Sequence, residues 1–219
     1  MNRNIDAVLF DLDGTLLDTA DDLGGALNAM LERRNRSPLP MSLLRNYVSR
    51  GAMTLVCIGF GCAAGSPESR DLWRELLDQY ANNLSANTVY FPGMERLLDY
   101  IERQQIPWGI VTNKPGFLTM PLLNELGITS RTKCIVSGDT LSEKKPHPAP
   151  LFHACQLLDC APERSIYVGD DKRDIEAGNR AGMLTLGATY GYILEDDNPK
   201  NWEADGLISH PDEIHGWID

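Results

Sequence analysis

The stretch AVLFDLDGTL, residues 7–16, decides the fold of this chain. Its uncharged first part contains β-branched and aromatic residues, and it is long enough for one buried strand but too short for a membrane span. Asp11 and Asp13 stand where that strand ends, and Gly14 follows at once. Ligands of an open α/β sheet bind beyond the carboxyl ends of its strands, so we expect both carboxylates to face a crevice.

The closeness of Asp11 and Asp13 predicts a cation between them. Two carboxylates one residue apart repel each other, most strongly where the dielectric is low. Mg²⁺ relieves such repulsion, because it prefers oxygen ligands and binds one or two carboxylates together with a substrate phosphate. The same residues also fit a strand-ending Asp followed by a common Asp-Gly turn, so residues further along the chain must decide.

Composition restricts the class of partner. The chain has 219 residues, enough for one large domain or two modest ones, and 42% hydrophobic with 23% charged residues is ordinary for a soluble globular protein. A net charge of −11 argues against nucleic acid and against anionic membrane surfaces as partners. An anionic substrate would therefore need local positive charge from a bound cation and a well-placed lysine.

Cysteine spacing and the first residues predict a cytoplasmic location. The five cysteines form no C-x-x-C pair and no zinc-binding spacing, which favours reduced thiols. Residues 1–4 lead directly into the first strand, without an apolar run of the secretory type.

A long helical excursion follows the first strand. Apolar residues recur at spacings of three and four from Leu23 to Leu31, as on one buried helix face. Further helices are predicted over residues 42–48, 52–60 and 69–84, and no strand signal is visible between residues 15 and 87. Because roughly 70 residues are too many for a loop, we expect a helical domain over 15–85, inserted into a core formed by 1–14 and 86–219.

Strands return in the second part of the chain and alternate with helices. Short apolar runs cover residues 107–112, 134–136, 165–168, 183–186 and 206–208. Helical patterns, notably over 150–158 and 174–181, separate most of them. This alternation predicts an α/β fold with a parallel sheet covered by helices on both faces.

Polar segments follow four of the predicted strands. They are Asp11 to Asp13, TNKP (112–115), KPHP (145–148) and GDDKRD (169–174). Each alone is weak evidence, since such residues also occur as helix caps, exposed loops and turns. Parallel strands place their carboxyl ends on one edge of the sheet, so the four segments are expected to converge.

These segments resemble the motifs of the haloacid-dehalogenase-like phosphatases, specifically their phosphoglycolate-phosphatase branch. The matching motifs are FDLDGT (10–15), VTN (111–113), KPHP (145–148) and VGDDKRD (168–174). The likeness covers essentially the whole chain, including a helical insert after the first motif. It implies a Rossmann-like core, a mobile helical cap and Mg²⁺-dependent hydrolysis of phosphomonoesters through a phospho-aspartate.

The resemblance assigns the chemistry to two carboxylates and one cation. Asp11 is the expected nucleophile, which splits one difficult step into two easier ones. Asp13 is the expected general acid and base, a task that needs a carboxyl group poised near working pH. Mg²⁺ is expected between Asp11, the carbonyl of Asp13 and Asp170, with Asp174 orienting metal-bound water from outside. Whether Asp171 also contacts the metal is left open.

The same resemblance assigns residues to the phosphate. Thr112 and the backbone around Asn113 are expected to hold phosphate oxygens, as are backbone N–H groups near Asp13. Lys145 is the expected point charge beside the phosphate and Asp11. We choose it over Lys144 because it directly precedes a proline, as in the family motif.

The helical insert is expected to select the substrate. Arg50 lies between two predicted helices, where its guanidinium can pair with a substrate carboxylate, or where it merely solvates a helix end. Lys114 is expected to face the entrance. Residues 190–205 also resemble the bacterial N-acetylmuramic acid 6-phosphate phosphatases.

The predicted substrate is therefore a small phosphorylated metabolite that carries a carboxylate. N-acetylmuramic acid 6-phosphate is the first expectation and 2-phosphoglycolate the second, with the protein a monomer or weak homodimer. A sugar phosphomutase with the same four motifs and a non-catalytic phosphate-binding module remain alternatives. A metal-free dehalogenase is disfavoured, because by family resemblance it lacks the second aspartate, Asp13.

Overall fold

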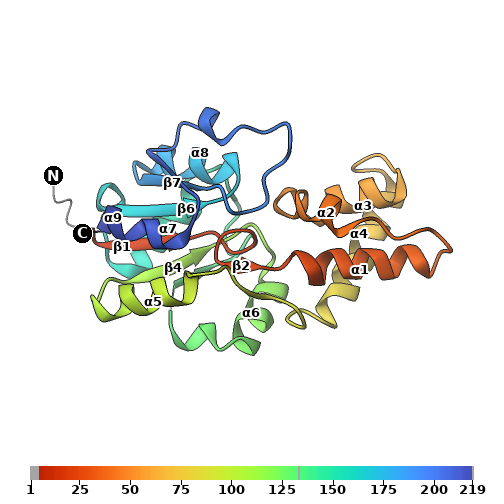
Figure 1. Ribbon diagram of the computed structural model, residues 1–219, viewed down its shortest axis with the longest axis horizontal. Helices are drawn as coiled ribbons and strands as arrows, with labels where there is room; N and C mark the ends of the chain where they lie inside the picture. The colour runs from red at the N-terminus through yellow and green to blue at the C-terminus, as the bar shows by residue number, and fades with distance from the viewer. Residues whose placement is uncertain (1–4, 133, 219) are drawn as a thin grey trace.

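The computed structural model describes residues 5–132 and 134–218, so positions 1–4, 133 and 219 of the predicted core lie outside the described residues. A six-stranded parallel sheet forms its centre (Figure 1). The strands are β1 (Ala7–Phe10), β4 (Trp108–Val111), β5 (Cys134–Val136), β6 (Ser165–Gly169), β7 (Leu184–Ala188) and β8 (Gly206–Ile208). Their order is β5-β4-β1-β6-β7-β8, and every pair is parallel. The predicted α/β class is confirmed, with β1 near the centre of the sheet.

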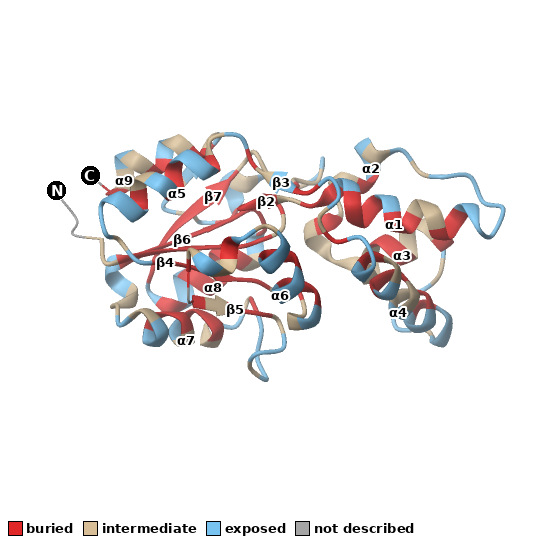
Figure 2. Ribbon diagram, turned by 90° about the horizontal axis from the view of Figure 1, so that it is seen from below, coloured by how far each residue is buried: buried red, intermediate tan, exposed pale blue. Residues whose placement is uncertain are grey.

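Helices cover both faces of the sheet. They are α5 (Met94–Arg103), α6 (Gly116–Glu125), α7 (Ala149–Leu158), α8 (Lys172–Ala181) and α9 (His215–Ile218). Figure 2 shows α5 and α9 on the opposite face from α7. Because successive strand side chains point to opposite faces, Phe10 joins the apolar cluster that contains Ile101 of α5, whereas Leu9 joins the cluster of Leu151 from α7. Burial on both sides explains why β1 is uniformly apolar.

A group of helices stands beyond one end of the sheet and is called the helical unit below (Figure 1). It consists of α1 (Ala20–Glu32), α2 (Met41–Arg45), a 3₁₀ turn (Val48–Arg50), α3 (Ala52–Phe60) and α4 (Pro67–Ala81). Leu27 and Met30 of α1 are fully buried in it, as their spacing predicts. A helix is present where 42–48 predicts one, but the predicted end is wrong: α2 ends at Arg45, and the chain then turns and brings Ser49 and Arg50 against the sheet edge.

Two short strands carry the chain into and out of the helical unit. β2 (Leu17–Asp18) pairs antiparallel with β3 (Val89–Tyr90). The expectation of no strand between residues 15 and 87 is therefore wrong. Two residues are too few to show an alternating pattern. Their partner strand, β3, follows only after the whole helical unit in the sequence. Among the described residues, no helix has both the length and the apolar character to cross a membrane.

Candidate active site

Asp11 is the first residue after β1, and the structure buries its carboxyl group. Its backbone N–H donates to the carbonyl of Val168 on β6, which holds the strand end in place. Oδ1 of Asp11 lies 2.8 Å from Nζ of Lys145, yet no described residue donates a well-aligned hydrogen bond to that oxygen. Burial and the charge of Asp174 raise the pKa of Asp11 to about 7, against the opposing effect of Lys145.

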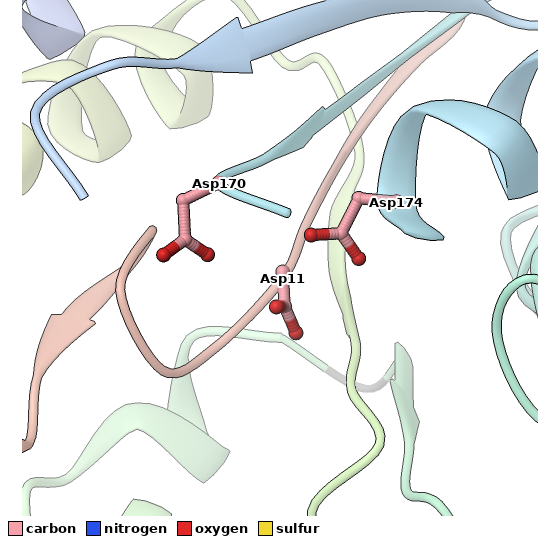
Figure 3. A group of neighbouring side chains, drawn as sticks. All are labelled: Asp11, Asp170 and Asp174. Carbon is pink, nitrogen blue, oxygen red and sulfur yellow. The ribbon is translucent and has the colours of Figure 1, made fainter. Parts of the chain in front are cut away.

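Three carboxylates converge at this point. Figure 3 shows Asp11 between Asp170, which follows β6, and Asp174, which belongs to the first turn of α8. One oxygen from each lies within 4.8 Å of the others. Asp170 and Asp174 are each only 1% exposed. Three buried carboxylates this close repel one another strongly, and an oxygen-binding divalent cation removes that cost.

Asp170 has the clearest need of a cation. It accepts hydrogen bonds from the hydroxyls of Thr15 (3.2 Å) and Ser49 (2.8 Å) and from the backbone N–H of Tyr192 (2.8 Å). Within the described part of the chain, no lysine, arginine or histidine forms an ion pair with it. Burial raises its pKa well above the ordinary value, and the charge of Asp11 adds to this effect. The donor set therefore fits Mg²⁺.

Asp174 is engaged differently from the other two carboxylates. Its Oδ1 lies 2.7 Å from Nζ of Lys145 and accepts a hydrogen bond from the hydroxyl of Tyr167. Its Oδ2 accepts from the backbone N–H of Asp171 and completes a capping box at the start of α8. Unlike Asp170, Asp174 is paired with a lysine and caps a helix, and its position outside the direct ligands stays a prediction.

Lys145 is a buried lysine beside the carboxylate cluster. It is 3% exposed, and besides its two carboxylate partners Nζ donates to the carbonyl of Val111 and the hydroxyl of Tyr167. Burial alone lowers a lysine pKa, but Asp11 and Asp174 together raise the pKa of Lys145 above its ordinary value. Lys144 also lines the cavity described below but is exposed. Of the two lysines, the structure therefore places the predicted one beside Asp11.

Thr112 and Asn113 follow β4 at the same edge. Thr112 is buried, and its hydroxyl accepts from the backbone N–H of Lys114. The amide side chain of Asn113 donates to the carbonyl of Lys145 and accepts from its backbone N–H, at 3.0 and 3.1 Å. This side chain therefore fixes the lysine segment, and the binding of a ligand by the surrounding backbone stays a prediction.

Asp13 lies on the side of the site that faces the helical unit. Its Oδ1 accepts from the hydroxyl of Thr19 at 2.7 Å and lies 2.9 Å from Nζ of Lys114. Lys114, expected at the entrance, is buried, and it also donates to the hydroxyl of Tyr80 on α4. Although burial opposes it, the charge of Asp13 and the hydrogen bond to Tyr80 raise the pKa of Lys114, so this lysine stays protonated.

Arg50 reaches the sheet edge from the 3₁₀ turn of the helical unit. Its guanidinium lies 3.0 Å from the carboxylate of Asp197 and 3.6 Å from that of Asp171. Asp171 also accepts from Arg173, and despite its burial these arginines lower the pKa of Asp171. The carboxylate cluster of the described residues does not include Asp171, whose carboxylate pairs with arginines instead.

A cavity of about 490 Å³ lies between the sheet edge and the helical unit. Asp11, Thr112 and Lys145 line its charged end. The other wall is largely apolar and aromatic, and its residues from the helical unit include Leu23, Val48, Met53, Trp73, Leu77 and Tyr80. The site therefore combines a buried anionic cluster, a buried lysine and an apolar wall, which suits a small organic phosphate held by both parts of the fold.

A family model described as haloacid dehalogenase-like hydrolase matches residues 8–188. The chain belongs to the haloacid dehalogenase-like hydrolase family. The match covers the helical unit and all four polar segments, so the resemblance seen in the sequence is confirmed.

Relatives within this family are similar over nearly their whole length. An N-acetylmuramic acid 6-phosphate phosphatase of Pseudomonas aeruginosa is 40% identical over 213 residues, which cover 97% of this chain and 94% of the relative. A phosphoglycolate phosphatase of Xylella fastidiosa is 43% identical over 204 residues, covering 93% and 89%. A crystal structure of a predicted phosphoglycolate phosphatase from Haemophilus somnus has a TM-score of 0.85 at 27% identity and covers 99% of both chains. The prediction that this haloacid dehalogenase-like hydrolase is a phosphatase is confirmed.

Some contacts of the site could not be predicted from the sequence. Ser49 contacts Asp170, and its hydroxyl also lies 3.5 Å from the carbonyl of Asp13. Arg173 donates to the carbonyl of Ser49, and Tyr192 donates to Asp170. These contacts join segments far apart in the chain, so spacing within one segment does not reveal them.

Proposed function

We propose that the protein hydrolyses small carboxylated phosphomonoesters in a Mg²⁺-dependent reaction that passes through an aspartyl-phosphate on Asp11. The observation that carries this proposal is the convergence of the buried carboxylates of Asp11, Asp170 and Asp174 beside the ammonium group of Lys145. Asp170 has no basic ion-pair partner among the described residues, so an oxygen-binding cation would supply the charge that this cluster lacks.

The proposed cation site consists of the carboxylates of Asp11 and Asp170 and the carbonyl of Asp13, with Asp174 outside the direct ligands. The convergence of the three carboxylates supports it. When bound, Mg²⁺ neutralises negative charge on the transferring phosphoryl group.

The proposed reaction has two steps. A carboxylate oxygen of Asp11 bonds to phosphorus while the bond to the leaving oxygen breaks, and Asp13 protonates that oxygen. Asp13 then takes a proton from water, whose oxygen attacks the phosphorus of the acyl phosphate and restores Asp11. The contacts of Asp13 with Thr19 and Lys114 support this role, because they fix the carboxyl group at the cavity wall.

Phosphate oxygens are proposed to bind Thr112, the backbone around Asn113 and the ammonium group of Lys145. All three lie at the charged end of the cavity. Lys145 places positive charge where an anionic substrate must arrive, and the proposed cation would add the charge needed to outweigh the neighbouring carboxylates.

The substrate proposal rests on the cavity and on the named relatives. N-acetylmuramic acid 6-phosphate is proposed first and 2-phosphoglycolate second, with Arg50 and Lys114 near the carboxylated end. The relatives named for these two substrates support this pair, and an apolar wall beside the charged end favours the larger molecule.

We further propose that residues 15–85 act as a cap domain on the core. The cytoplasmic location and the monomeric or weakly dimeric state stay predictions.

One assay series tests the reaction. Purified protein is expected to release phosphate from p-nitrophenyl phosphate with Mg²⁺, to stop with EDTA, and to lose activity at least 10³-fold in Asp11→Asn. Activity that survives EDTA or this substitution contradicts the mechanism.

A comparison of kcat/KM for the two proposed substrates and several sugar phosphates then tests specificity. A tenfold difference in kcat/KM corresponds to about 1.4 kcal/mol of transition-state binding. Isomerisation of a hexose 1-phosphate without phosphate release contradicts hydrolysis.

A further inference from the structure

Tyr192 connects the carboxylate cluster with the start of the helical unit. Its backbone N–H donates to Oδ2 of Asp170 at 2.8 Å. Its hydroxyl oxygen accepts from the backbone N–H groups of Thr19 (2.7 Å) and Ala20 (3.0 Å), where α1 begins. The residue is 3% exposed, and Figure 1 shows the segment after β7 extending toward α2. One buried residue thus bonds to both halves of the proposed site.

The hydroxyl of Tyr192 serves as the cap of α1. The first N–H groups of a helix have no partner within the helix and need an acceptor from outside. The side chain of Thr19 stands at the capping position but makes no bond to the helix, because its hydroxyl donates to Asp13 instead. The acceptor therefore comes from Tyr192, which lies 172 positions after Ala20 in the sequence.

The contacts continue from Tyr192 into the second helix of the unit. Its hydroxyl donates to Oδ1 of Asp18 at 2.8 Å. Both oxygens of Asp18 accept from the guanidinium of Arg45 on α2, at 2.9 and 2.7 Å. That guanidinium also stacks 5.1 Å above the ring of Tyr192. The donor and both acceptor positions of the phenol are used, and all three point into the connection between sheet and helical unit.

The backbone at Tyr192 has little room to move independently of Asp170. A Cβ atom at Gly191 would lie 2.3 Å from Cβ of Asp170 and 2.4 Å from the carbonyl oxygen of Gly14, so only glycine allows this approach. A displacement of α1 that pulls on the phenol must therefore have one of two effects. It breaks the hydrogen bonds that the backbone N–H groups of Thr19 and Ala20 donate to the phenol, or it moves the backbone N–H of Tyr192 that bonds to Asp170.

We propose that Tyr192 is a positioning residue that couples the orientation of the helical unit to cation binding at Asp170. The inference rests on the proposed function, because it assumes a divalent cation at that carboxylate. Coupling of this kind is reciprocal: a cation that fixes Asp170 holds the start of α1, and a displaced helical unit weakens cation binding by the same factor.

Hydrogen exchange measured by mass spectrometry tests the coupling without any activity assay. Mg²⁺ is expected to slow amide exchange in the peptide that contains Thr19 and Ala20 at least threefold in the wild-type protein. In Tyr192→Phe, which keeps the ring and the backbone N–H, this protection is expected to disappear. Equal protection in Tyr192→Phe and wild type overturns the proposal, as does a wild-type protein whose α1 does not respond to Mg²⁺.

Tyr190→Phe is the matched control. Tyr190 lies in the same segment and packs on Phe91, as Tyr192 does, but its hydroxyl donates to the carbonyl of Thr15 rather than meeting α1. It is expected to keep the Mg²⁺ protection. If both variants lose it, general loosening of the segment is the cause and the specific coupling is overturned.

A titration of Mg²⁺ binding supplies the reciprocal measurement. Tyr192→Phe is expected to raise the dissociation constant for Mg²⁺ by the same factor by which protection falls, and Tyr190→Phe to leave it within twofold. A dissociation constant unchanged in Tyr192→Phe overturns the coupling. Mg²⁺-dependent protection in a protein that releases no phosphate supports the coupling and contradicts the proposed function, so the two failures are distinguishable.

Discussion

Nζ of Lys114 lies 2.9 Å from Oδ1 of Asp13, so a buried lysine at the sheet edge holds the carboxyl group proposed as the general acid. The same ammonium donates to Tyr80 of α4, which joins the pair to the helical unit. A cation in this position orients Asp13 and also stabilises the fold, and the two contributions can be measured separately.

Lys114→Met is expected to destabilise the protein and to slow the reaction. Removing one member of a buried ion pair costs about 3–5 kcal/mol, and partial exposure of Asp13 places the expected loss near the lower end. Because Asp13 loses the group that orients it, kcat is expected to fall about 10²-fold, typical of impaired acid-base catalysis. Urea unfolding and steady-state kinetics measure the two effects. Lys144→Met, at an exposed position, is expected to leave stability within about 0.5 kcal/mol.

The raised pKa of Asp11 predicts a pH dependence of stability in the metal-free protein. Its value moves from 3.8 to about 7 on folding, so between these pH values the folded state binds more protons than the unfolded state. Stability therefore decreases as pH rises from about 4 to 7, by at most about 4 kcal/mol for this group, and Asp170 shifts in the same direction.

Thermal unfolding in EDTA across this pH range measures the decrease. Asp11→Asn is expected to flatten the curve and to be more stable than wild type at pH 8, because it removes one charge from the cluster. Mg²⁺ at 100 times its dissociation constant at pH 8 is expected to stabilise wild type by about 2.7 kcal/mol at that pH. The same concentration is expected to stabilise it less at pH 5. A metal-free protein whose stability rises steadily from pH 4 to 7 contradicts this account.

The hydrogen bonds of Asp22 predict that its substitution lowers the stability of the fold, although Asp22 has no proposed part in the reaction. It is a buried residue of the first turn of α1, and its two oxygens accept hydrogen bonds from the backbone and side chains of Asn87 and Thr88 where the chain leaves the helical unit. Asp22→Asn turns an amide group toward these donors and is expected to cost about 2 kcal/mol. Its exposed neighbour Asp21 shares the same helix end, so Asp21→Asn should cost under about 0.5 kcal/mol in the same denaturant titration. Equal losses in both variants would assign the effect to the helix dipole.

The sequence predicted the part of the fold that follows from periodicity and from the topology of parallel strands. The apolar run before Asp11 predicted a buried strand, and the common edge of parallel strands predicted that Asp11, Asp170 and Lys145 meet. These expectations needed no knowledge of side-chain partners, because strand order and burial alone fix where the strand ends lie.

The rest depends on partners that are remote in the chain. β2 exists because Leu17 and Asp18 meet β3, and the cap of α1 comes from Tyr192. The amide side chain of Asn113 is occupied by Lys145 for the same reason. No local pattern distinguishes such residues from ordinary loop residues, so only the folded chain reveals what they contact.

Arg50 gives the sharpest prediction about the substrate. Arg50 lines the cavity, but its guanidinium is already paired with Asp197 and, more loosely, with Asp171. A substrate carboxylate that binds Arg50 must therefore compete with Asp197, and the two substitutions are expected to act in opposite directions. Arg50→Met should raise KM for 2-phosphoglycolate and N-acetylmuramic acid 6-phosphate at least tenfold while leaving p-nitrophenyl phosphate within twofold. Asp197→Asn should lower KM for the carboxylated substrates alone. An Arg50→Met variant that affects all three substrates equally would instead make Arg50 a structural contact between the helical unit and the sheet edge.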